Sequence, residues 1–164
     1  MKAGNTYSDS MFNPRKMRNT VALLASRLPA LRRQYGFDTI VVTGKSGIAL
    51  GFALSMVTGV HVVAVRKGES SHGDMIEGDG HEFTRYAFLD DGIASGSTVE
   101  RVADELKSYA QSRAQAEPVR VLCLLYSNFG TENDSVVEGH WGPTWSLPYH
   151  SLQHADPKWS QLAT

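Results

Sequence analysis

Four short apolar runs constrain the fold of this chain more than any other feature. They are TIVV (39–42), VHVVAV (60–65), YAFL (86–89) and VRVLCLLY (119–126). Each run is nearly continuously apolar instead of alternating, which is typical of strands that are buried on both faces. Such strands occur in parallel sheets with helices on both sides. The runs therefore predict an α/β fold with a central, mostly parallel sheet flanked by helices.

The segments between these runs have the composition of crossover helices. Residues 47–59 are apolar on almost all sides and end at a glycine, which predicts a buried helix. Residues 97–112 carry apolar side chains on one face and charges on the other. Ser97 and Glu100 have the spacing of a capping box at the start of that helix. Strand, helix and strand in succession predict right-handed crossovers.

Three further segments lie outside this alternation. An amphipathic helix is predicted over 17–31, and Pro29 is expected to break or kink its last turn. Residues 66–85 form a long polar stretch with an Asp-Gly turn signal at Asp79, and a loop of this length is more often a functional flap than a connector. Residues 127–164 are rich in Gly, Pro, Trp and His and are expected to form a small C-terminal hood.

Length and composition predict one domain, residues 1–164, with its core at about 36–127. The net charge of -1 gives no general reason to expect a polyanion, so a nucleic-acid partner is not expected. Cys123 is the single cysteine and reads as a reduced, buried thiol. No run approaches the roughly twenty apolar residues of a membrane span, so we expect a cytoplasmic protein without a membrane partner.

Ligands of open α/β sheets bind outside the carboxyl ends of the strands. That rule selects TGKSG (43–47), RKGESSHG (66–73) and DDGIASGST (90–98). In the third, Asp90 and Asp91 end the strand, and the small residues that follow let backbone N–H groups surround an anion at a helix start. Two carboxylates suit a vicinal diol, with a divalent cation nearby to balance charge. A ribose 5-phosphate has both the diol and the phosphate.

The stretch YAFLDDGIASGST (86–98) resembles the signature of the type I phosphoribosyltransferases, which bind 5-phosphoribosyl-1-pyrophosphate (PRPP). The resemblance implies that Asp90 and Asp91 contact the ribose hydroxyls and Mg²⁺, directly or through ribose and water. It also implies a loop for the 5-phosphate, formed by Ala94, Ser95, Gly96, Ser97 and Thr98. The chain departs from the family pattern at Gly92 and Ala94, and the alanine removes one candidate general base.

Two more loops resemble those of the same family. VVTGKSGIALGFALS is similar to the pyrophosphate loop, which implies pyrophosphate contacts from Thr43, Gly44, Lys45, Ser46 and Gly47. VAVRKGESSHG is similar to the mobile loop of the orotate-specific branch. The catalytic residues implied by these two loops, acting on pyrophosphate, are Lys45, Arg66, Lys67 and His72.

The resemblance implies a phosphoribosyltransferase in which a nucleobase nitrogen attacks the anomeric carbon of PRPP and pyrophosphate leaves with magnesium. A flap that reaches into a partner subunit, as in the orotate branch, implies a homodimer. One alternative is a catalytically silent, PRPP-sensing regulatory protein of the same fold. A P-loop kinase is a weaker alternative, since the glycine needed five positions before Gly44 is Thr39.

Simpler interpretations compete at each site. Residues 90–98 could be a strand-to-helix turn with a capping box, and 43–47 a turn that starts a helix. Arg66 and Lys67 could be a solvated strand end, and His72 a surface histidine.

The sequence leaves the nucleobase open between orotate and a purine. The flap resembles the orotate branch, whereas residues 128–148 occupy the position that purine-specific members use for their hood. Phe129, Trp141 and Trp145 are most simply core or interface aromatics, and base stacking by one of them is the alternative.

Overall fold

The structure is a computed structural model and describes residues 13–68, 75–90, 97–115, 117–126, 136–137 and 147–151. In these ranges the elements are α2 (Pro14–Tyr35), β1 (Thr39–Thr43), α3 (Gly44–Thr58), β2 (His61–Val65), β3 (Ile76–Glu77), β4 (Arg85–Asp90), α4 (Ser97–Ser112), β5 (Arg120–Tyr126), β6 (Val136–Val137) and β7 (Leu147–Ser151). All four apolar runs form strands, as predicted.

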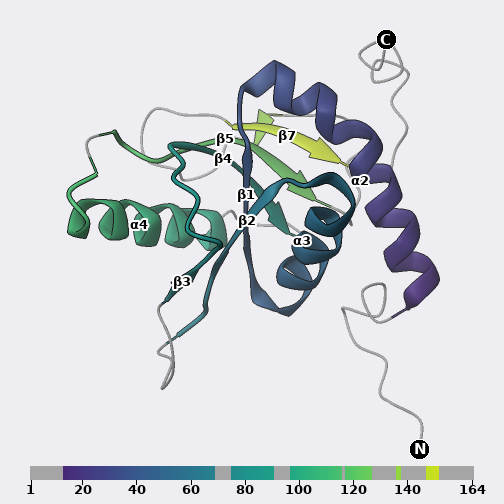
Figure 1. Ribbon diagram of the computed structural model, residues 1–164, viewed down its shortest axis with the longest axis horizontal. Coiled ribbons are helices and arrows are strands. Elements are labelled where there is room, and N and C mark those ends of the chain that lie inside the picture. The colour runs from purple at the N-terminus through teal and green to yellow at the C-terminus, as the bar shows by residue number, and fades with distance from the viewer. Residues whose placement is uncertain are drawn as a thin grey trace, which may run out of the picture.

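The strands form one sheet in the order β3-β2-β1-β4-β5-β7-β6. β1 pairs in parallel with β2 and β4, and β5 pairs in parallel with β4 and β7. β3 and β6 are antiparallel to their neighbours β2 and β7. Figure 1 shows α2 and α3 on one side of the sheet and α4 on the other. The predicted α/β fold with a mostly parallel sheet is therefore confirmed.

Two hydrophobic clusters explain why the strand sequences are continuously apolar. Ile40 and Val42 of β1 pack with residues of α2 and α3, whereas Val41 between them packs with residues of α4. Every residue of β1 is buried. Burial of one such side chain stabilises the fold by about 1.5–3 kcal/mol. Cys123 is buried and free, as predicted, and its burial raises the pKa of its thiol.

The predicted break of the first helix at Pro29 is wrong, because α2 continues to Tyr35. Pro29 itself is exposed, while Leu28 and Leu31 beside it are almost fully buried. A proline inside a helix costs about 3 kcal/mol, and the apolar burial on both sides of Pro29 offsets this cost. The helix ends instead at Tyr35, and Gly36 directly after it has a φ of 71°.

α3 is the predicted crossover helix between β1 and β2, but it is buried on one side only. Its buried side packs closely on the sheet: a Cβ on Gly51 would lie 2.8 Å from Cγ1 of Val42. Its other side exposes Phe52 by 54%, Met56 by 87% and Val57 by 61%. High apolar content predicted burial, but among the described residues neighbouring elements cover one face of this helix alone.

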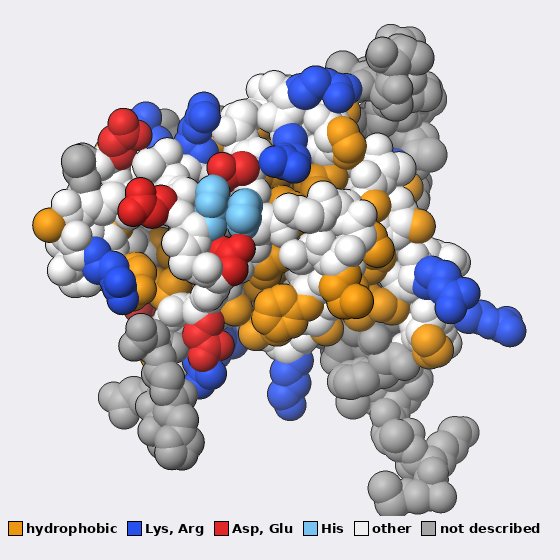
Figure 2. Space-filling view, viewed as in Figure 1, with side chains coloured by type: hydrophobic (Ala, Val, Ile, Leu, Met, Phe, Trp, Pro, Cys, Tyr) orange, Lys and Arg blue, Asp and Glu red, His pale blue; other side chains and the backbone are white. Residues whose placement is uncertain are grey.

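The segment predicted as a flap contains a part that is fixed to the sheet. β3 pairs with the edge of β2, and the chain then turns at Gly80, which has a φ of 82°. The stacked rings of His61 and His81 lie 3.7 Å apart, between two carboxylates (Figure 2). Residues 69–74 of this segment lie outside the described residues.

Each ring of this histidine pair bonds to one carboxylate. His61 Nδ1 lies 2.7 Å from Asp79, and His81 Nε2 lies 3.2 Å from Asp38. The side-chain bond from His61 and the backbone bond from His81 lower the pKa of Asp79. Burial opposes ionisation of Asp38, but hydrogen bonds from Thr39 and His81 outweigh it and lower the pKa of this carboxyl.

β7 extends the sheet beyond β5 in the segment expected to form a hood. The sequence did not predict this strand, because LPYHS is short, partly polar and interrupted by a proline. The remaining residues from 127 onward lie outside the described residues. Among the helices that the structure describes, none is long and apolar enough to cross a membrane.

Candidate functional site

The carboxyl ends of β1, β2 and β4 lie side by side, because these strands are parallel neighbours. Thr43 at the end of β1 pairs in register with Val65 at the end of β2. On the other side, Val42 pairs with Leu89, the residue before Asp90. All three predicted ligand loops therefore begin at one edge of the sheet, which we call the carboxyl edge.

The predicted pyrophosphate loop turns from strand to helix within one residue. Thr43 is extended, with φ of -148° and ψ of 161°, and Gly44 has a φ of 69°. Glycine adopts this left-handed conformation without steric cost, unlike most other residues. Thr43 does not cap the helix with its side chain, because its Oγ1 donates to the carbonyl of Val65 at 2.6 Å. The first amides of α3 therefore have no side-chain cap from Thr43 and can receive an anion.

Lys67 lies over this loop. A Cβ on Gly44 would be 3.5 Å from Nζ of Lys67 and 3.6 Å from its Cε. Lys45, the next residue of the loop, is exposed, as is Lys67. The structure thus brings together the glycine turn and one predicted catalytic lysine from a different loop.

Asp90 packs against the first turn of α3. A Cβ on Gly47 would lie 3.6 Å from Oδ1 of Asp90 and 3.3 Å from the carbonyl of Leu89. Asp90 is only 9% exposed. A side chain at position 47 would approach the carbonyl of Leu89 more tightly than an ordinary contact and would touch the carboxylate of Asp90. The predicted sugar-binding acid and the predicted pyrophosphate loop are therefore neighbours.

Arg66 follows β2, and its side chain reaches the neighbouring strand β3. Its guanidinium forms an ion pair with Glu77, and its backbone N–H donates to the carbonyl of Met75 at 2.9 Å. Ser97 and Thr98 form the start of α4. The other predicted site residues lie outside the described residues: His72, Asp91, Ala94, Ser95, Gly96, Phe129, Trp141 and Trp145.

One carboxylate oxygen of Glu100, Oε1, does not form the hydrogen bond of the predicted capping box. α4 begins at Ser97. Oε1 of Glu100 is buried and has no hydrogen-bond partner in the part of the chain that the structure describes.

Arg101 is a residue of this edge that sequence reasoning missed. From the second turn of α4 it donates to Thr43 Oγ1 at 3.1 Å and to the carbonyl of Arg66 at 3.3 Å. The helical pattern assigned the charges of residues 97–112 to the solvent-facing side. The available signal was its position four residues after Ser97, which keeps it close to the carboxyl edge.

Cations dominate the described part of this edge. Within the described ranges, Lys45, Lys67 and Arg101 form no ion pair, and the three pairs found there involve Arg66, His61 and His81. Those same ranges hold no group of three or more His, Cys, Asp or Glu side chains suited to a metal. Mg²⁺ is commonly bound by one or two carboxylates together with substrate phosphates. Asp90 could supply one such carboxylate.

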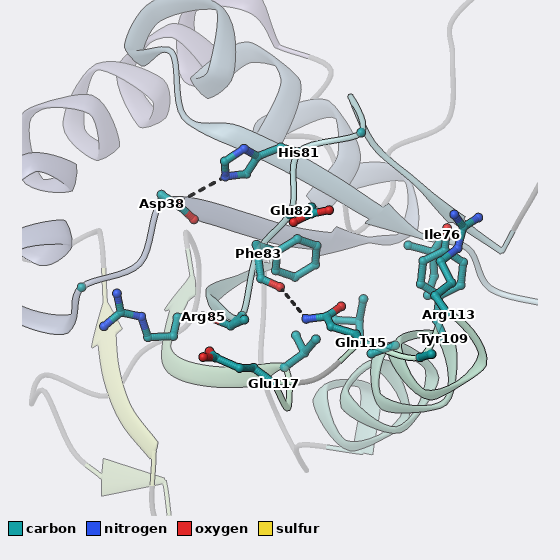
Figure 3. A pocket seen from close by; sticks show the side chains of 17 residues that line it. Asp38, Ile76, His81, Glu82, Phe83, Arg85, Tyr109, Arg113, Gln115 and Glu117 are labelled. Atoms are coloured by element: carbon teal, nitrogen blue, oxygen red, sulfur yellow. Dashed lines mark hydrogen bonds and ion pairs between the residues drawn. The ribbon is translucent and has the colours of Figure 1, made fainter.

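A cavity of about 790 Å³ lies elsewhere, near the amino ends of β1, β4 and β5 (Figure 3). Gln115 donates to the carbonyl of Phe83 at 3.2 Å within it. Its lining also includes Asp38, His81 and Arg85, and none of the predicted site residues. This cavity is therefore separate from the carboxyl edge.

Solved structures of a UMP synthase and of two phosphoribosyltransferases resemble this fold. A UMP synthase from Leishmania donovani is 18% identical with a TM-score of 0.59, and the match covers 86% of this chain and 27% of that one. An orotate phosphoribosyltransferase from Aeropyrum pernix is 14% identical with a TM-score of 0.57, covering 91% and 77%. An adenine phosphoribosyltransferase from Saccharomyces cerevisiae, solved with adenine, is 19% identical with a TM-score of 0.54, covering 85% and 80%.

No protein-family model matches the chain, and no curated protein sequence matches it. The chain spans about a quarter of the length of the Leishmania protein and most of the other two. Together with the strand order and the three convergent loops, these similarities define the class: the chain has the type I phosphoribosyltransferase fold.

Proposed function

We propose that the protein is a phosphoribosyltransferase that transfers the 5-phosphoribosyl group from PRPP to a nucleobase. One observation carries this proposal: an acid and a cationic loop meet at the carboxyl edge. Asp90 lies against Gly47 at one end of the loop, and Lys67 lies against Gly44 at its start. An acid for a sugar diol thus adjoins amides and cations for a pyrophosphate.

In the proposed reaction, a nitrogen of the nucleobase attacks the anomeric carbon while the bond from that carbon to pyrophosphate breaks. The base loses a proton, and the products are a nucleoside monophosphate and pyrophosphate. Asp90 accepts hydrogen bonds from the ribose hydroxyls and so orients the sugar. Lys45, Lys67 and the first amides of α3 stabilise the negative charge that develops on pyrophosphate.

Mg²⁺ would supply further positive charge to the pyrophosphate oxygens. Asp90 is the described residue that would hold it, together with the phosphates of the donor.

The proposal extends to the assembly and location of the protein. We propose a cytoplasmic homodimer, and the exposed apolar side chains of Phe52, Met56 and Val57 on α3 support self-association. Light scattering over a range of protein concentrations measures the mass, and a monomer at every concentration would exclude the dimer.

Calorimetric titration with PRPP and Mg²⁺ tests the sugar site. We expect Asp90→Asn to weaken PRPP binding by about tenfold to a hundredfold, because hydrogen bonds to a charged group contribute about 1.5–3 kcal/mol. Asp79→Asn is the matched control, since this acid is exposed beside His61 and away from the carboxyl edge. Absent binding by the wild type, or equal binding by Asp90→Asn, would contradict the proposal.

Turnover is tested with a panel of orotate, uracil, adenine, hypoxanthine, guanine and xanthine. Solved structures of both an orotate and an adenine enzyme resemble the chain, so the panel includes both kinds of base. We expect release of pyrophosphate with one class of base. Tight PRPP binding without release for any base would instead favour the PRPP-sensing regulator.

A further inference from the structure

Arg101 joins three separate segments of the carboxyl edge. It lies on α4, four residues after Ser97, and its side chain is half-buried. One guanidinium nitrogen donates to Thr43 Oγ1 at 3.1 Å, and the other donates to the carbonyl of Arg66 at 3.3 Å. The turn before α3, the chain after β2 and the helix after β4 therefore meet at one side chain.

The two acceptors of Arg101 are themselves held in place. Thr43 Oγ1 donates to the carbonyl of Val65, so the hydroxyl has both a donor and an acceptor partner. The N–H of Arg66 donates to Met75, which fixes the same residue to the segment that leads into β3. A displacement of Arg101 would therefore disturb the ends of β1 and β2 together.

An ordinary surface arginine on a helix would pair with a nearby acid. Asp104 and Glu105 lie three and four residues further along α4, at the spacing that favours such pairs. Among the described residues, however, Arg101 bonds to two neutral oxygens and forms no ion pair. Its guanidinium presents several donors in a rigid fork, which suits two acceptors on different segments.

We propose that Arg101 is a positioning residue that sets the distance between the pyrophosphate loop and the helix that follows the 5-phosphate loop. This inference rests on the proposed function, in which one donor molecule carries a phosphate group for each loop. A fixed distance favours a ligand that bridges both loops, because less ordering is needed on binding. The fixed distance gives a much smaller advantage to a ligand that occupies only one of the two loops.

Titration of PRPP, of pyrophosphate alone and of ribose 5-phosphate alone separates these cases. Arg101→Lys keeps the positive charge but loses the two-pronged bond. We expect it to weaken PRPP binding by about tenfold, which corresponds to about 1.4 kcal/mol, and to change binding of each fragment by less than about threefold. Equal losses for PRPP and pyrophosphate would overturn a positioning role.

A second readout needs no ligand. In the free protein, Arg101→Lys is expected to speed amide hydrogen exchange at 43–47 and 66–68 and to leave β5 unchanged. Arg113→Lys is the matched control, because this arginine lies near the other end of α4 and stacks on Tyr109, 4.6 Å from the ring centre. Unchanged exchange at both loops in Arg101→Lys would overturn the inference.

Variants of the acceptor guard against a folding defect at position 101. Thr43→Val removes the hydroxyl and should reproduce the faster exchange at 66–68, whereas Thr43→Ser should restore wild-type exchange. If both variants exchange as the wild type does, the inference fails. If the wild type binds neither PRPP nor its fragments, the proposed function fails, and the exchange data still decide whether Arg101 couples the loops.

Discussion

The two edges of the parallel sheet differ in whether their charged side chains have a partner of opposite charge. At the amino edge, near the start of β2, His61 and His81 each bond to an aspartate, and the two rings stack on each other (Figure 2). At the carboxyl edge, Lys45, Lys67 and Arg101 form no ion pair within the described residues. The two aspartates of the amino edge thus have cationic or hydrogen-bonding partners, whereas these three cations pair with no acid in the part of the chain that the structure describes.

This difference shows which edge favours an external anion. Cations without an acidic partner at the amide-bearing start of a helix attract phosphate groups. No existing ion pair has to break when an anion replaces the water around them. At the amino edge a ligand would have to compete with bonds that already exist. A cavity of about 790 Å³ lies beside the amino edge, yet its size alone does not mark it as the site of the chemistry.

The largest expected effect comes from removing a cation from each edge in turn. We expect Lys67→Met to weaken binding of pyrophosphate by about tenfold to a hundredfold, since bonds between charged groups contribute about 1.5–3 kcal/mol. Arg85→Met removes a cation from the cavity beside the amino edge and should leave this affinity unchanged. Calorimetric titration with pyrophosphate and Mg²⁺ measures both, and equal losses would erase the distinction between the edges.

A smaller effect is expected from crowding a glycine. A Cβ on Gly47 would lie 3.3 Å from the carbonyl of Leu89, and one on Gly78 would lie 3.3 Å from Val63. The two alanine variants therefore introduce contacts of the same length, with a backbone oxygen at position 47 and with a side-chain methyl group at position 78, but only Gly47 adjoins Asp90. We expect Gly47→Ala to weaken PRPP binding about threefold to tenfold, on the order of 1 kcal/mol, and Gly78→Ala to leave it unchanged.

Thermal unfolding of both alanine variants is the control for that comparison. Similar shifts in melting temperature with a loss of affinity in Gly47→Ala alone would support the site. Unchanged PRPP affinity in Gly47→Ala would show that the contact between Asp90 and α3 does not matter for the donor.

Much of this arrangement could be predicted from sequence because it depends on strand burial. Residues such as Ile40 and Val41 face opposite sides of the sheet, and both sides are covered, so a continuous apolar run predicted each central strand correctly. The convergence of three loops then followed from parallel pairing. β3, with two residues, and β7, with a proline, gave no comparable signal.

What sequence could not predict depends on tertiary contacts. Pro29 lies within a helix because buried leucines on either side hold that helix to the core. Phe52 and Met56 are exposed because the described neighbouring elements pack on the opposite face of α3. Arg101 follows the same logic: its acceptors are 58 and 35 residues away in the chain, so no local pattern could identify them.

The smallest expected effect concerns the amino edge and its pH dependence. Because hydrogen bonds hold the pKa of Asp38 below its ordinary value of 3.8, the folded state favours the ionised carboxylate. That stability is present above pH 3.8 and is lost as the pH falls through the lower folded value. We expect Asp38→Asn to lower the free energy of unfolding by less than about 1 kcal/mol near neutral pH, since the pair is partly exposed.

Urea unfolding of the wild type and of Asp38→Asn on both sides of pH 3.8 measures this contribution. The difference between the two proteins should shrink as the pH falls, while the affinity of Asp38→Asn for PRPP near neutral pH stays at the wild-type value. A constant difference would mean that ionisation of Asp38 does not stabilise the edge. A loss of PRPP affinity would mean that the amino edge supports the donor site, because no described contact of Asp38 reaches the carboxyl edge.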